Sequence, residues 1–81
     1  MNKKIKPYGL VWTNHKKYYL LEPYTERNVF SDGTFEFLVV PYFHADFNPI
    51  VFTPRFIRTT EFSLEYAVVD EIEIQVSELE E

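Results

Sequence analysis

The sequence VFSDGTFEFLVV, residues 29–40, places an Asp-Gly pair between two runs of β-branched and aromatic residues. Asp32-Gly33 tolerates the positive φ values of a tight hairpin turn, and such a pair between apolar runs is a strong local signal for a hairpin. The stretch therefore predicts a short strand at residues 29–30, a turn at residues 31–34 and a longer strand over residues 35–43.

The rest of the chain continues this succession of short apolar runs and turn residues. Pro23 ends one run, whereas Pro41 and Pro54 require a bend, a bulge or a sheet edge, because proline cannot donate to a β-ladder. The pattern predicts an all-β fold, a small SH3-like barrel or a sandwich, with about five to seven short antiparallel strands. Its further predicted parts are strands at residues 8–12, 17–22 and 50–58, a turn at 13–16 and a loop at 44–49.

Residues 62–76 alternate between apolar side chains at even positions and mostly polar ones at odd positions, apart from Asp70. This pattern predicts a strand with one solvent-exposed face. The run is longer than a usual strand, so we expect a bend or a break near Asp70. One bent strand, two strands and a partial helix all stay open, because Leu64, Val68, Ile72 and Val76 also follow helical spacing.

The chain has 81 residues, which is room for a single domain spanning residues 1–81. Residues 1–6 and 77–81 are predicted to fray, because chain ends are poorly ordered unless they are tied down. Hydrophobic residues make up 46% and aromatic residues 19%, enough to build a core without any cysteine. The sequence shows no signal-peptide pattern and no apolar stretch of ~18–20 residues, so we expect a cytoplasmic protein without membrane contact.

No residues of this sequence have the spacing of a known catalytic, metal or cofactor site. Cysteine is absent and the histidines are His15 and His44, so a nucleophile with a base and an orienting acid is not available. His44 and Asp46 could supply two ligands, whereas a closed zinc site needs about four. The glycines are too sparse for a loop that cradles phosphate. We therefore predict a protein that is not an enzyme and holds no metal or cofactor.

Aromatic residues of the first half of the chain lie close to basic residues in the sequence. Small barrels can stack single-stranded nucleic acid on such rings, although the net charge of −5 offers little attraction for phosphates. A stacking platform is therefore an alternative site, and its candidate members are Trp12, Tyr18, Tyr19, Tyr24 and Tyr42 with Lys16, Lys17 and Arg27.

The segment PYGLVW at residues 7–12, followed by a turn and by YYLL at residues 18–21, resembles the first hairpin of a WYL domain. Tyr18-Tyr19-Leu20 stands where that family has Trp-Tyr-Leu. The resemblance implies an SH3-like or Sm-like barrel, and WYL domains are sensor modules of bacterial regulators that bind nucleotides or nucleic acids through basic residues. FEFLV at residues 35–39 replaces the arginine-bearing strand of the family, so the resemblance implies the barrel and assigns no functional residue.

Small size, surplus aromatic residues and an acidic net charge favour a protein-interaction module. The predicted partner is a bacterial protein with a basic site, and the module would act as a phage-encoded or host regulatory inhibitor of the anti-defence type. Two alternatives stay open: a WYL-like barrel that senses a nucleotide or single-stranded nucleic acid, and a structural phage protein or assembly subunit that pairs through edge strands. The sequence leaves the oligomeric state undetermined.

The residues predicted to contact the partner are the glutamates of the last run and two tyrosines. Alternation places Glu65, Glu71 and Glu73 opposite the apolar positions of residues 62–76, where they form an acidic face. Tyr18 and Tyr24 are the further candidates, because tyrosine is enriched among the residues that anchor interfaces.

Overall fold

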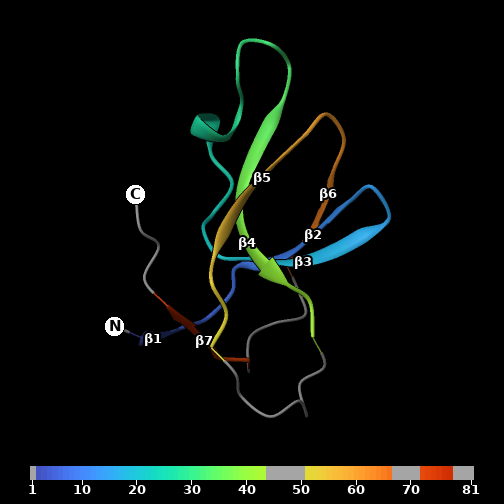
Figure 1. The fold of residues 1–81 in the computed structure, drawn as a ribbon. Coiled ribbons are helices and arrows are strands. Elements are labelled where there is room, and N and C mark those ends of the chain that lie inside the picture. Colours follow the sequence, from blue (N-terminus) through green and yellow to red (C-terminus); the bar gives the residue numbers. More distant parts are fainter. Residues whose placement is uncertain (1, 44–50, 67–71, 78–81) are drawn as a thin grey trace.

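The computed structural model describes residues 2–43, 51–66 and 72–77, and its regular elements are strands and one short 3₁₀ helix. The strands form two antiparallel sheets, a five-stranded one in the order β5-β4-β3-β2-β6 and a two-stranded one, β1-β7 (Figure 1). The all-β prediction is confirmed. Within the described residues the larger sheet does not close into a barrel, so the small sandwich is the better of the two predicted architectures.

The five-stranded sheet is a meander whose last strand returns to its start. Its β4 ends at Pro41 and its β5 begins directly after Pro54, as expected for residues that cannot donate to a ladder. Residues 60–62 then carry the chain across to the opposite edge, where β6 pairs with β2. The strands of this sheet are β2 (Gly9–Thr13), β3 (Lys16–Leu20), β4 (Phe35–Pro41), β5 (Arg55–Thr59) and β6 (Ser63–Glu65).

Both faces of this sheet are covered, which explains why its central strands read as continuous apolar runs. Alternation along each strand sends neighbouring residues to opposite faces. One face carries the buried residues Val11, Tyr18, Leu20, Phe37 and Val39. The other face lies under the small sheet, and its core contains Leu10, Tyr19, Leu21, Val40, Ile74 and Val76.

The small sheet joins the two ends of the chain. Its strands are β1 (Asn2–Ile5) and β7 (Ile74–Ser77), paired from Asn2↔Ser77 to Ile5↔Ile74. The prediction that the ends fray is therefore wrong for residues 2–5 and for Ser77. The physical reason is burial: Ile74 and Val76 are each 1% exposed in the core, and that burial holds β1 in place through the ladder.

The described residues of the 62–76 run lie in two strands of different sheets, β6 and β7, so the interpretation as one bent strand is wrong. The expected break at Asp70 lies outside the described residues. Alternation holds on both sides of it: Ile74 and Val76 are buried, Leu64 is half-buried, and Glu65 and Glu73 are exposed.

Both predicted hairpin turns are present, but their geometries differ from the expectation. Asp32 does not have a positive φ; Gly33 alone does in that turn, at 86°, and its N–H donates to the carbonyl oxygen of Phe30 (3.0 Å). The two-residue turn with both φ values positive is the one between β2 and β3, where Asn14 has 50° and His15 has 64°. Asn and His tolerate this region better than most residues, which explains the turn without glycine.

The five-stranded sheet curls around the face that carries Tyr18. Thr13 at the end of β2 donates a hydrogen bond to Thr59 at the end of β5 (Oγ1 to Oγ1, 2.6 Å), although β3 and β4 lie between these strands.

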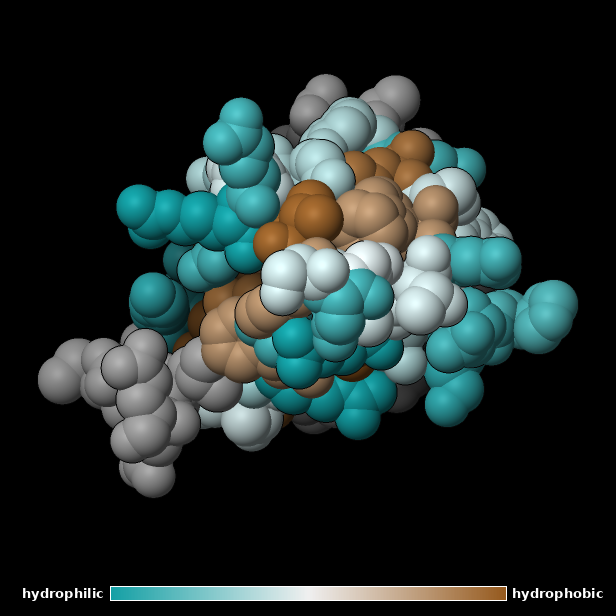
Figure 2. Space-filling model, turned by 90° about the horizontal axis from the view of Figure 1, so that it is seen from above, coloured by the Kyte–Doolittle hydropathy of each residue, from teal (hydrophilic) through white to brown (hydrophobic). Residues whose placement is uncertain are grey.

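Viewed from above, hydrophobic side chains gather in the middle of the surface with hydrophilic ones around them (Figure 2). Large hydrophobic side chains therefore reach solvent at this end of the molecule.

Candidate functional site

The predicted acidic face is not a single surface of one strand. Glu65 is the last residue of β6 in the large sheet, and Glu73 precedes β7 in the small sheet. Both side chains are exposed, as the alternation predicts. Glu71 lies outside the described residues. Because Glu65 and Glu73 belong to different sheets, sequence alternation alone does not bring them together.

The two tyrosines chosen from the sequence contribute to the core. Tyr18 is 7% exposed and its hydroxyl accepts a hydrogen bond from Arg55 Nη2 (3.4 Å). Tyr24 is half-buried and packs against Phe37 and Phe62, with ring centroids 5.9 and 5.6 Å apart. Tyr19, a member of the predicted stacking platform, is 1% exposed, and burial raises the pKa of its hydroxyl. Tyr18 and Tyr19 therefore do not offer stacking faces to a ligand.

Other aromatic side chains reach solvent instead. Tyr8 is 49% exposed, and Tyr66 is 52% exposed. Each lies just outside a strand, Tyr8 before β2 and Tyr66 after β6, where the alternation that marks inward positions no longer applies. Their exposure could have been predicted from their position in the sequence, because Tyr8 and Tyr66 lie next to the end of a strand and not within the strand.

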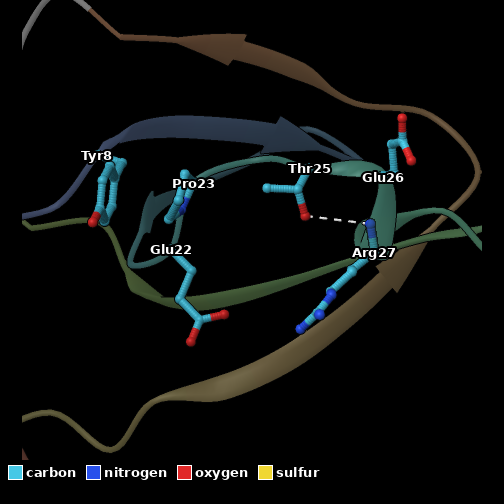
Figure 3. A pocket seen from close by; sticks show the side chains of 6 residues that line it. All are labelled: Tyr8, Glu22, Pro23, Thr25, Glu26 and Arg27. Carbon is cyan, nitrogen blue, oxygen red and sulfur yellow. Dashed lines mark hydrogen bonds between the residues drawn. The ribbon is translucent and has the colours of Figure 1, made fainter.

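An open hollow of about 700 Å³ lies beside Tyr8, where β2 begins and β3 ends (Figure 3). The Tyr8 N–H donates to the carbonyl oxygen of Leu20 (2.8 Å), which fixes the backbone of Tyr8 at this end of the sheet. Pro23 then stops β3, and the chain passes over the hollow into the 3₁₀ helix η1 (Glu26–Asn28). The residues that line the hollow are Tyr8, Glu22, Pro23, Thr25, Glu26 and Arg27.

The wall formed by η1 is held by a capping box. The Thr25 hydroxyl accepts a hydrogen bond from the Arg27 N–H (3.3 Å), drawn in Figure 3, and the Thr25 N–H donates to Asn28 Oδ1 (2.6 Å). Asn28 Nδ2 also donates to the carbonyl oxygen of Glu36 in β4 (2.6 Å). These bonds attach a loop with exposed charges to the rigid sheet, so the hollow has a defined shape.

Glu65 and Tyr66 lie at the same end of β2 as the hollow. Gly9 approaches them so closely that a Cβ atom there would overlap the carbonyl oxygen of Glu65 and lie 3.2 Å from the Tyr66 Cα. We call the group Tyr8, Glu22, Glu26, Glu65 and Tyr66 the tyrosine–glutamate end. It combines two exposed rings with three exposed carboxylates, and the cation Arg27 lines the same hollow.

The opposite end of β2 carries a second exposed aromatic group. The Lys17 ammonium lies 3.9 Å from the centroid of the Tyr42 ring and 4.6 Å from that of Trp12. Trp12 and Lys17 are direct partners across the β2–β3 ladder. This cluster brings together three members of the predicted stacking platform, and Trp12 and Tyr42 are 38% and 37% exposed.

Charge is distributed less evenly than the net value of −5 indicates. All eight Lys and Arg residues lie in the described parts of the chain, but only seven of the thirteen Asp and Glu residues do. The other six carboxylates lie outside the described residues and belong to the net charge of −5 of the whole chain. Local groups of charge decide which partner each surface suits, and the net charge does not.

Within the described ranges, no three His, Asp or Glu side chains are grouped so that they could hold a metal ion. His44 and Asp46, the predicted candidates for such ligands, lie outside those ranges. In the same part of the chain no helix is long and apolar enough to cross a membrane.

No protein-family model, curated protein or solved structure matches the chain.

Proposed function

We propose that the domain is a non-catalytic protein-interaction module that binds a basic site on a bacterial protein through its tyrosine–glutamate end. It would act as a phage-encoded or host regulatory inhibitor. The observation that carries this proposal is the open hollow lined by the exposed Tyr8 ring and by the charged residues Glu22, Glu26 and Arg27, with Glu26 on the side away from Tyr8 (Figure 3).

The side chains at this end have the chemistry of an interface that receives cations. Tyrosine rings supply large contact areas with little loss of conformational entropy, and they are enriched among binding hot spots. Carboxylates around them attract a basic partner and speed its association. A Lys or Arg side chain that enters the hollow would meet the face of an aromatic ring as well as a carboxylate.

The rigidity of the hollow supports the same proposal. The capping box at Thr25 and the bond from Asn28 to β4 order the loop before any partner arrives. Binding then costs less conformational entropy than it would for a mobile loop. A preordered, charged and aromatic hollow therefore suits a tight inhibitor.

The test begins with capture of partners from a bacterial lysate on the immobilised protein. Binding of the purified partner is then measured for three variants with the same change of charge. Glu22→Lys alters the hollow, Glu73→Lys alters the predicted strand face, and Glu61→Lys is the matched control at the other end of β6. We expect Glu22→Lys to slow association about tenfold at low salt, and Glu61→Lys to bind like the parent.

The outcomes distinguish the surfaces. A larger loss for Glu73→Lys than for Glu22→Lys would place the interface on the strand face. Equal binding by Glu22→Lys and Glu61→Lys, or failure to retain any bacterial protein, would contradict the proposal. Urea unfolding of each variant shows whether a loss of binding comes from a loss of the fold, since single exposed charges change stability by less than ~1 kcal/mol.

A second candidate function is binding of single-stranded nucleic acid or a nucleotide, favoured by the cluster of Trp12, Lys17 and Tyr42. Exposed rings with a cation between them can stack bases while the cation meets a phosphate. Fluorescence anisotropy of an oligonucleotide at two salt concentrations tests this function. Binding that weakens with salt and is lost in Trp12→Ala would favour it over the protein-interaction module.

A further inference from the structure

A second hollow, of about 240 Å³, lies on the concave face of the five-stranded sheet beside the Asn14–His15 turn. It is more enclosed than the hollow at Tyr8 and lies at the opposite end of β2. In Figure 1 this end is the tip of the β2–β3 hairpin. The residues that line it are Thr13, Asn14, Lys16, Tyr18, Ile57 and Arg58.

The charged residues that line this hollow are cations, and the nearby carboxylates lie around Arg58: Asp32 interacts electrostatically with Arg58, and Glu36 is the partner of Arg58 across the β4–β5 ladder. Lys16 and Arg58 line it, and no carboxylate is among its lining residues. Lys16 is exposed, and strand alternation points it to the same face of β3 as Tyr18, away from Lys17. The Arg58 guanidinium carbon lies 3.8 Å from the centroid of the Phe30 ring, which restricts where this cation can be.

The Tyr18 hydroxyl adds a neutral donor to the two cations. It already accepts a hydrogen bond from Arg55 Nη2 (3.4 Å), so its lone pair is engaged and its hydrogen is left to donate. Within the described parts of the chain this hydrogen has no acceptor. Arg55 therefore acts as a positioning residue that presents Tyr18 as a donor.

The floor of the hollow is preorganised. The Thr13 hydroxyl donates to Thr59, whose hydroxyl in turn donates to the carbonyl oxygen of Glu61 (2.8 Å). Thr13 and Tyr18 are both buried. Donors fixed on a rigid sheet bind an anion without first being ordered, which favours binding.

We infer that this hollow binds a small oxyanion of the inorganic phosphate and sulfate class. The Lys16 ammonium and the Tyr18 phenolic donor match an oxyanion, and Arg58, which also interacts with Asp32, adds positive charge beside them. The volume of about 240 Å³ lies below the range of about 300–1,000 Å³ for pockets that hold drug-sized molecules, which favours a small ion. The site does not depend on the proposed interaction function, which uses the other end of β2.

The test is a titration of the full chain with inorganic phosphate, and separately with sulfate, at an ionic strength held constant with sodium chloride. Two-dimensional ¹H–¹⁵N NMR reports binding at the amides of Lys16 and Tyr18. We expect saturable shifts at these amides, and affinity lowered about tenfold or more in both Tyr18→Phe and Lys16→Gln. The matched control is Lys4→Gln, which removes an equal charge from the exposed side of β1 and should bind like the parent.

Several results would overturn the inference. Shifts that do not saturate, or that appear equally with chloride alone, mean that phosphate and sulfate only screen charge. If Lys4→Gln and Lys16→Gln weaken phosphate binding equally, phosphate and sulfate again only screen charge. Adenosine monophosphate that binds more than about tenfold tighter than phosphate means that the hollow is part of a nucleotide site. Because Tyr18 is buried and its variant could unfold, Lys16→Gln on the surface keeps the test decisive.

Discussion

The two ends of β2 are fixed by different kinds of contact. At its start, Gly9 lets the backbone of β2 approach Glu65 and Tyr66 of the returning strand. At its end, the side chain of Thr13 reaches Thr59 across two intervening strands, and the chain turns through two residues with positive φ. The comparison teaches that the tyrosine–glutamate end depends on backbone fit, whereas the hollow beside Thr13 depends on side-chain hydrogen bonds.

The largest expected effect is at the start of β2. Gly9→Ala introduces a Cβ atom that overlaps a backbone carbonyl oxygen, and backbone cannot yield as a flexible side chain can. We expect a loss of about 2–3 kcal/mol in the free energy of unfolding, measured by urea denaturation, with exchange protection lost first in β6.

The control for this prediction is Gly33→Ala, at a site with φ 86° and no atom within 4 Å of the added carbon. There only backbone strain operates, at a cost of about 1 kcal/mol. If both variants lose the same stability, backbone fit at Gly9 is not special and the contrast between the two ends fails.

The next effect is at the end of β2. The test is whether Thr59→Val lowers the free energy of unfolding more than Thr13→Val does. The Thr59 hydroxyl bonds to Thr13, to the Glu61 N–H (3.2 Å) and to the Glu61 carbonyl oxygen, whereas the Thr13 hydroxyl bonds to Thr59. We expect Thr59→Val to cost about 2 kcal/mol, because it leaves a buried hydroxyl unpaired, and Thr13→Val about 1 kcal/mol. A double variant that costs the full sum would show that the two hydroxyls are not coupled.

Local patterns in the sequence were sufficient for much of this fold. Turn residues and proline located β2, β3 and β4 to within two residues, because these signals act between neighbours in the chain, whereas the strand predicted over residues 50–58 matches β5 only from Arg55 onward. Pairing of β1 with β7 joins residues 69 to 75 positions apart, from Ile5↔Ile74 to Asn2↔Ser77, and no local pattern encodes such a register. A lysine-rich start and a polar end therefore looked like frayed termini.

The candidate site was predictable only in part, for a related physical reason. Composition indicated an aromatic and acidic interface, and Glu65 does lie at the tyrosine–glutamate end. Which tyrosines are exposed depends on the curl of the sheet, which buries Tyr18 and leaves Tyr8 in solvent. Glu22 and Glu26 were missed because their grouping with Tyr8 requires the pairing of β2 with β3 and the turn of η1.

A smaller effect is expected at the tip of the hairpin. His15 has a φ of 64°, a region that costs an ordinary residue about 1 kcal/mol, and Asn-Gly is the favoured pair for a two-residue turn of this geometry. His15→Gly should therefore raise the free energy of unfolding by about 0.5–1 kcal/mol. His15→Ala, which keeps a Cβ atom at the same φ, should give no gain. Equal behaviour of the two variants would show that the turn is not strained.

The smallest effect is a difference in acid sensitivity between the turn at Gly33 and the turn at His15. The turn at Gly33 is held by a carboxylate, that of Asp32. The hydroxyl and N–H of Thr34 donate to Asp32 Oδ1 (2.6 and 3.0 Å), and these bonds lower the pKa of Asp32 below its ordinary value. A depressed pKa in the folded state means that the stabilisation is complete above the unfolded value of 3.8 and is lost as the pH falls through the lower folded value. Acid should therefore loosen this turn while the Asn14–His15 turn stays unchanged.

The chemical shift of the Thr34 amide should change with pH below 3.8 in the parent. It should not change in Asp32→Asn, which keeps an acceptor oxygen but cannot ionise. A titration of Thr34 that persists in the variant would assign the acid sensitivity to another group, and the two turns would then not differ in the way proposed.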